Sequence, residues 1–203
     1  VVVPGFDNAN PKGALSWAAF LMDYGYWLHH LPAGVISSAP TWNVAYKHAA
    51  LLDLGDGLGS ALTGGDELAT AFRARGRTIC FHPAARIDHA NVARRRSWVD
   101  ERFLSGLLIG GNRRDRWTAS RRWVHVLASP LIAAVVLSRI VRPARVALRH
   151  GMLPWGTIPA LIIGAIVRTI GEVTGYIAGV QGDAEPRMER YELHKVQFTV
   201  ARP

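Results

Sequence analysis

The sequence predicts an α/β fold followed by two apolar helices that lie in, or cross, a membrane. Helical periodicity recurs through the first half of the chain, and two short strand-like segments, 77–82 and 85–89, follow it. Two apolar stretches, 123–141 and 153–167, then indicate the membrane helices. The predicted parts are an α/β domain at 1–122, a membrane-associated helical region at 123–180 and a polar C-terminal tail at 181–203.

Three helices are predicted before the strand-like segments. The first covers 10–30, with Asn10 as N-cap, Pro11 at the first helical position and aromatic residues at spacings of three and four. The second covers 43–54 and is closed by Gly55. The third covers 63–75, with acidic residues in its first turn, arginines in its last turn and a glycine directly after it.

The apolar stretch 123–141 is close to the length of about 17–20 residues that a bilayer-spanning helix needs. Arginines flank it on both sides, which a simple span disfavours under the positive-inside rule. The arginines after it fall at spacings of three and four and share one helix face, although Pro143 interrupts them. We therefore favour helices at the membrane interface, with true spans and buried core helices as alternatives.

The positive charge of the chain is concentrated in one region. The formal net charge is +9, yet residues 94–150 alone hold thirteen arginines against three acidic side chains. The partner of this region is therefore local and anionic: membrane lipid, a diphosphate or nucleic acid. Nucleic acid is the weakest of the three, because apolar segments adjoin the charges and aromatic side chains do not alternate with them. The single cysteine, Cys80, excludes an internal disulfide framework.

A series of motifs resembles the second half of a family 2 glycosyltransferase, most closely the membrane-associated bacterial members. The motifs, in chain order, are "NVAYKHAALLDLG", "GGDELATAFRARGRTICFHPAARIDH", "SWVDERFLSGLLIGGNRR", the two apolar stretches and "RYELHK". The resemblance implies a GT-A fold, of which residues 1–122 form the acceptor-side half. It also implies sugar transfer from a nucleotide-sugar donor to a lipid-linked or polysaccharide acceptor, with Mg²⁺ or Mn²⁺, at the cytoplasmic face of a bacterial inner membrane.

The family's nucleotide-binding, Rossmann-like half carries an Asp-x-Asp metal motif, which this sequence lacks. The chain also begins at Val1, inside an apolar run. We therefore expect a partial GT-A domain, a fragment that is inactive by itself. The alternative is a non-catalytic, membrane-anchored binding module, a degenerate relative of the family.

Asp66 and Glu67 are the candidate catalytic residues. In the family, a carboxylate at this place takes the proton of the acceptor hydroxyl. Counting back from Gly76 puts that position at Gly65, one residue before Asp66. Asp66 serves as the base if the loop shifts by one residue. Otherwise the base is lost, and both acids only stabilise the N-terminus of a helix.

Four further residues correspond to binding positions of the family. His89, after the second strand-like segment, is the candidate metal ligand, with a structural histidine as the alternative. Arg102 is suited to binding phosphate oxygens, or else faces solvent or lipid. Trp42 offers a surface on which a sugar can stack. Asn43 offers a hydrogen-bonding amide at the mouth of the site, or simply a helix cap.

Overall fold

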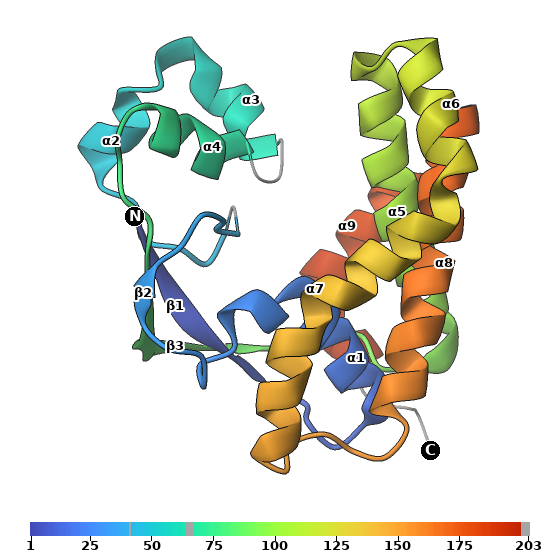
Figure 1. The fold of residues 1–203 in the computed structure, drawn as a ribbon, viewed down its shortest axis with the longest axis horizontal. Helices are drawn as coiled ribbons and strands as arrows, with labels where there is room; N and C mark the ends of the chain where they lie inside the picture. Colours follow the sequence, from blue (N-terminus) through green and yellow to red (C-terminus); the bar gives the residue numbers. More distant parts are fainter. Residues whose placement is uncertain (41, 64–66, 200–203) are drawn as a thin grey trace. The chain divides into compact units, whose positions relative to one another are not determined.

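A computed structural model describes residues 1–40, 42–63 and 67–199, which are mostly helical and include one small sheet (Figure 1). The mixed α/β composition expected from the sequence is therefore confirmed. The chain forms two compact units. The sheet unit comprises residues 1–7 and 27–88, and the helical unit comprises residues 8–26 and those from 89 onward. The predicted boundary after residue 122 falls inside a helix, α6 (Ala119–Leu127).

The sheet of the described residues has three strands in the order β1-β3-β2. Strand β1 (Val2–Asn8) is almost continuously buried, as expected for a strand covered on both faces. It runs parallel to β3 (Cys80–His89): the Cys80 amide donates to Val1 near the start of both strands, and the Ala9 amide donates to His89 near their ends. The two-residue strand β2 (Gly34–Val35) pairs antiparallel with β3.

The prediction of two separate strands at 77–82 and 85–89 is wrong, because β3 runs through Pro83 without a break. Proline lacks the amide hydrogen that a central strand donates to its neighbour. Strand β2, however, pairs only with Cys80 and Phe81, so β3 has no ladder on that side at Pro83. The proline therefore interrupts no hydrogen bond with β2.

The predicted helix 43–54 begins later than expected, as α2 (His48–Leu52). Asn43 has a φ of +61°, which no right-handed helix contains, so it neither opens nor caps this helix. The described part of the predicted helix 63–75 is α4 (Glu67–Ala74), and the helix before it, α3 (Leu58–Thr63), was not predicted. The short helices close over a small core of Ala50, Leu54, Ala61, Leu68 and Phe72.

The predicted helix 10–30 is shorter, as α1 (Ala14–Asp23) followed by one 3₁₀ turn (Gly25–Trp27). Asn10 is not its cap: the Asn10 side-chain amide donates to the carbonyls of Asn91 and Thr199, and Gly13 is the N-cap residue. The long-range bonds of Asn10 therefore take the place of a local cap. The expected apolar face is present, with Trp17 and Phe20 fully buried.

The helical unit is built around α5 (Arg95–Arg116) and α8 (Thr157–Ala178), which lie side by side (Figure 1). Glycines allow this contact. A Cβ atom added to Gly106 would lie 1.9 Å from the Arg168 carbonyl oxygen, and one on Gly171 would lie 2.1 Å from that of Phe103. Gly110 and Gly175 approach the opposite backbone in the same way. We call Gly106, Gly110, Gly171 and Gly175 the glycine seam; each helix carries its pair four residues apart, a pattern typical of close helix packing.

Among the described residues, α8 is the one helix that is by itself long and apolar enough to cross a membrane. Half of its most apolar segment is buried inside the protein. It extends beyond the predicted stretch 153–167 by about three turns. The other stretch forms α6 and α7 (Ser129–Arg149), which meet at an angle of 72°. The bend falls at Ala128, whereas Pro143 lies within a continuous α7.

The predicted tail is part of the helical unit. Its helix α9 (Ala184–Leu193) packs Ala184 against Leu104 and Leu107 of α5. Arg187 and Tyr191 of α9 both bond to the Asp100 carboxylate of α5. The 3₁₀ turn Lys195–Phe198 follows and directs Lys195 towards the end of β3.

Candidate functional site

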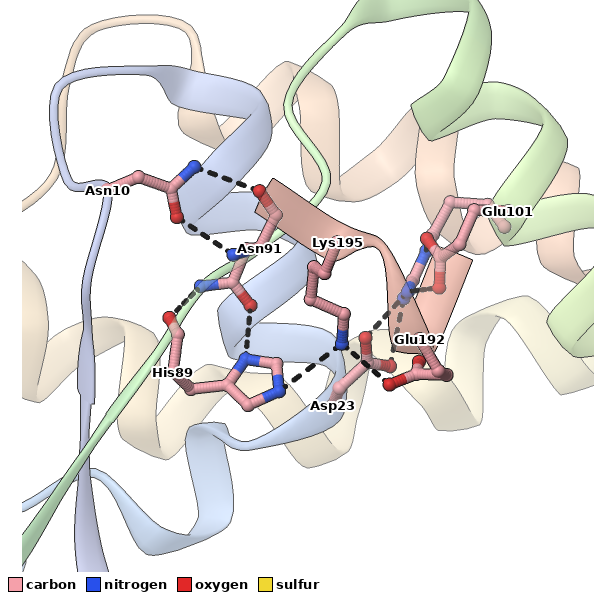
Figure 2. A network of polar contacts seen from close by, with 8 residues as sticks. Asn10, Asp23, His89, Asn91, Glu101, Glu192 and Lys195 are labelled. Atoms are coloured by element: carbon pink, nitrogen blue, oxygen red, sulfur yellow. Dashed lines mark hydrogen bonds and ion pairs between the residues drawn. The ribbon is translucent and has the colours of Figure 1, made fainter. Parts of the chain in front are cut away.

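A polar network inside the helical unit joins residues from five parts of the chain (Figure 2). Asn10 follows β1, and Asp23 ends α1. His89 ends β3, and Asn91 follows it in the next loop. Glu101 and Arg102 come from α5, while Glu192 and Lys195 come from α9 and the turn after it. We call these eight residues the interior polar network.

Arg102 anchors one half of the network and is 1% exposed. Its two terminal nitrogens donate to the two Asp23 oxygens at 2.9 and 2.6 Å, and its Nε donates to Glu101 Oε2 at 2.7 Å. Burial opposes the ionised form of Asp23, but the surrounding cations, Arg102 first and then Arg168 and Lys195, together hold the pKa of Asp23 below its ordinary value. For Glu101 burial dominates, so its pKa is raised although Arg102 opposes the rise. Asp23 is therefore the firmly ionised partner of Arg102.

His89 centres the other half, and its hydrogen bonds fix its tautomer. The Asn91 side-chain NH₂ donates to Asn8 Oδ1 and to the His89 carbonyl, both at 2.9 Å, so Asn91 Oδ1 is an acceptor. His89 Nδ1 must then donate to it, at 3.0 Å, which leaves the Nε2 lone pair facing the Lys195 ammonium at 3.3 Å. Burial, and next the charge of Lys195, lower the pKa of His89. His89 is thus neutral at pH 7.

Lys195 supplies the cation between His89 and Glu192, to which its Nζ donates at 2.7 Å. The His89 nitrogen that could bind a metal therefore faces an ammonium group (Figure 2). Within the described ranges, no cluster of three His, Cys, Asp or Glu side chains could hold a metal ion. These residues do not fit a divalent cation as they stand, and the expected Mg²⁺ or Mn²⁺ stays a prediction.

The other predicted site residues belong to the sheet unit. Trp42 is 59% exposed, as a sugar-stacking surface requires, and Asn43 follows it with its left-handed backbone. Glu67 is the first residue of α4. Asp66 lies outside the described residues. Their roles stay predictions, as do those of His89 and Arg102 in the helical unit. Separate sets of hydrogen bonds surround His89 and Arg102, and the charge of Lys195, beside His89, also acts on Asp23, beside Arg102.

Sequence reasoning missed six members of the network as site residues: Asn10, which was predicted only as a helix cap, and Asp23, Asn91, Glu101, Glu192 and Lys195. Asp23 left a signal: it is the one charged residue of helix 14–23, in which the other residues apart from Ser16 are apolar. Such a charge at the end of a buried helix requires a partner. The partner, Arg102, is 79 residues further along the chain, so no local pattern could name it.

The helical unit also exposes many apolar side chains on α6, α7 and α8. Twelve large apolar side chains on these helices are at least 45% exposed: Trp123, Val124, Leu127, Leu131, Val135, Leu148, Ile158, Ile162, Ile163, Ile166, Ile170 and Ile177. We call these twelve residues the apolar face. So many exposed large apolar side chains on three helices of one unit favour contact with lipid or with a partner over contact with water. Exposed arginines (Arg139, Arg142, Arg145 and Arg149) lie on α7 beside them.

Comparisons with protein-family models, curated proteins and solved structures gave no match to this chain. The family resemblance therefore rests on the motifs and their order.

Proposed function

We propose that the helical unit attaches this protein to a membrane, and that the protein is the acceptor-side part of a glycosyltransferase. The apolar face is the observation that carries the proposal. Lipid would cover its isoleucines and leucines, while the arginines of α7 would contact anionic headgroups. The resemblance of the motifs, in their order, is the basis for the rest of the proposal. The donor would be a nucleotide sugar, the acceptor a lipid-linked molecule or a polysaccharide, and the location the cytoplasmic face of a bacterial inner membrane.

Sugar transfer of this kind would use a carboxylate of the sheet unit. The acceptor hydroxyl attacks the anomeric carbon, the bond from that carbon to the diphosphate oxygen breaks, and the carboxylate takes the hydroxyl proton. We assign this carboxylate to Asp66, with Glu67 beside it. Trp42 and Asn43 would contact the sugar.

The internal bonds of Arg102 and His89 favour a second candidate function, a non-catalytic lipid-binding module. Arg102 donates to two carboxylates and His89 uses both ring nitrogens, so each would have to give up a partner to bind substrate. The two candidates share the membrane attachment and differ in sugar transfer.

Vesicle flotation tests the attachment. The 203-residue chain should float with vesicles that contain phosphatidylglycerol better than with pure phosphatidylcholine vesicles. This preference should weaken as the salt concentration rises from about 0.05 M to about 0.5 M, because the ions screen the arginines. Equal, salt-insensitive binding to both would show that the apolar face acts as a true span. No flotation at all would refute the attachment.

Turnover tests the sugar transfer. Membranes from cells that express the complete gene, with any part that encodes the nucleotide-binding half, are given radiolabelled nucleotide sugars and a lipid extract. Asp66→Asn should lower turnover by about 10²–10⁴-fold, the usual share of general base catalysis, and Glu67→Gln should cost much less. If the wild type transfers sugar and neither change matters, the base is elsewhere. A wild type that transfers no sugar from any donor, yet floats with vesicles, supports the lipid-binding module.

A further inference from the structure

A pocket of about 350 Å³ in the helical unit combines an apolar wall with three arginines. Helix α7 supplies the apolar wall through Leu131, Ile132, Val135 and Val136. Its volume lies in the range of small-molecule sites. The pocket adjoins the apolar face, because Leu131 and Val135 belong to both.

The charged lining of this pocket consists of Arg113, Arg139, Arg168 and Glu172. Glu172 is buried and already satisfied: Arg113 Nη1 donates to Glu172 Oε1 at 2.5 Å, and the Tyr176 hydroxyl donates to the same oxygen at 2.6 Å. The charges of Arg113 and Glu172 therefore cancel. Arg139 and Arg168 are left without a compensating charge from the lining.

Arg168 is the unusual member. It is only partly exposed, and its Nε is fully buried without a hydrogen-bond partner in the described part of the chain. The carboxylate of Asp23 attracts it electrostatically, but both Asp23 oxygens are already bonded to Arg102. A buried N–H group without an acceptor is costly, and proteins usually supply one. An anion in the pocket that Arg168 lines would offset the positive charge of its guanidinium group.

We propose that this pocket binds the phosphate group of a lipid-like molecule. The phosphate would accept hydrogen bonds from Arg168 and Arg139, since a guanidinium group matches phosphate oxygens in shape and charge. Two uncompensated arginines balance a phosphate monoester dianion. The hydrocarbon chain would lie along the α7 wall and continue onto the apolar face. The inference rests on the membrane attachment proposed above and is independent of sugar transfer.

Binding of octyl phosphate tests the pocket, measured by calorimetry on the chain in phosphatidylcholine nanodiscs. Inorganic phosphate tests the headgroup alone, and octyl glucoside tests the chain with a neutral headgroup. Octyl phosphate should bind about tenfold more tightly than either, because only it uses both walls. Arg168→Gln and Arg139→Gln should each weaken octyl phosphate binding about tenfold.

Arg190→Gln is the matched control. Arg190 is exposed on α9 of the same unit and outside the pocket, and this change removes the same charge. It should alter binding less than about twofold. Arg168→Gln should also leave the melting temperature of the ligand-free protein unchanged or higher, since it removes a buried charge whose Nε has no partner among the described residues. A lower melting temperature would show that Arg168 is structural and refute the proposal.

Three other results would overturn the inference. Equal affinity for octyl phosphate and octyl glucoside would show that the arginines do not bind the headgroup. Equal affinity for octyl phosphate and inorganic phosphate would show a site for free phosphate, without use of the apolar wall. Equal losses in Arg168→Gln and Arg190→Gln would show attraction by the net charge alone. None of these three results contradicts the membrane attachment if the protein still floats with vesicles. The phosphate pocket and the membrane attachment can therefore be refuted independently.

Discussion

The glycine seam makes a sharp prediction: Gly106→Ala should destabilise the helical unit although it adds one methyl group. The new Cβ would lie 1.9 Å from the Arg168 carbonyl oxygen, whereas non-bonded heavy atoms prefer about 3.5 Å or more. Both sides of this contact are backbone, so no side chain can rotate away. Helices α5 and α8 must separate instead, and their whole interface loses contact.

The magnitude follows from two opposing effects. Overpacking of a tight interface costs about 1–3 kcal/mol, and this contact belongs at the upper end or beyond it. Alanine in place of glycine within a helix stabilises that helix by about 1 kcal/mol. The net loss is then about 2 kcal/mol or more in the free energy of unfolding. For a chain of this length, that lowers the melting temperature by roughly 4–8 °C.

Far-ultraviolet circular dichroism in neutral detergent would measure this loss as a shift of the helical melting transition. Gly13→Ala is the matched control in the same unit: a Cβ on Gly13 meets no atom within 4 Å, and its φ is −118°. It should cost less than about 1 kcal/mol, because alanine is the weaker N-cap residue. If Gly106→Ala melts at the wild-type temperature, the two helices do not pack as closely as described.

Two further predictions concern the interior polar network. Arg102→Met should destabilise the protein by about 3–5 kcal/mol in chemical denaturation, because Asp23 and Glu101 would lose their cation. Adding Asp23→Asn should recover part of that loss. A double variant no more stable than Arg102→Met would contradict the ion pair. ¹⁵N NMR should show His89 as the neutral Nδ1–H tautomer at pH 7, with a pKa below about 6.5 that rises in Lys195→Gln. Because the pKa of His89 is lower in the folded state, the unfolded state binds this proton more tightly. The contribution of His89 to the free energy of unfolding is therefore complete above about pH 6.5 and is lost as the pH falls towards the pKa in the folded state. His89→Gln should remove this pH dependence.

The sequence by itself determined the features that depend on near neighbours. Apolar residues at helical spacing gave α1 its buried face, and a long apolar run predicted a helix at α8. Charge counting located the basic region of the chain, which contains the arginines of α7. These features follow from composition and periodicity, which act within a few turns of the same element.

Tertiary structure alone decided the features that join distant segments. Strand β1 pairs with the distant β3, and Asn10 bonds to Asn91, 81 positions later, instead of capping α1. Arg102, expected to bind phosphate, is buried against Asp23, while Arg168, unremarkable in the sequence, lines a pocket with its buried Nε unpartnered among the described residues. The physical reason is that an arginine's function depends on which anions surround it. Those anions are brought near by chain folding, and no local pattern encodes them.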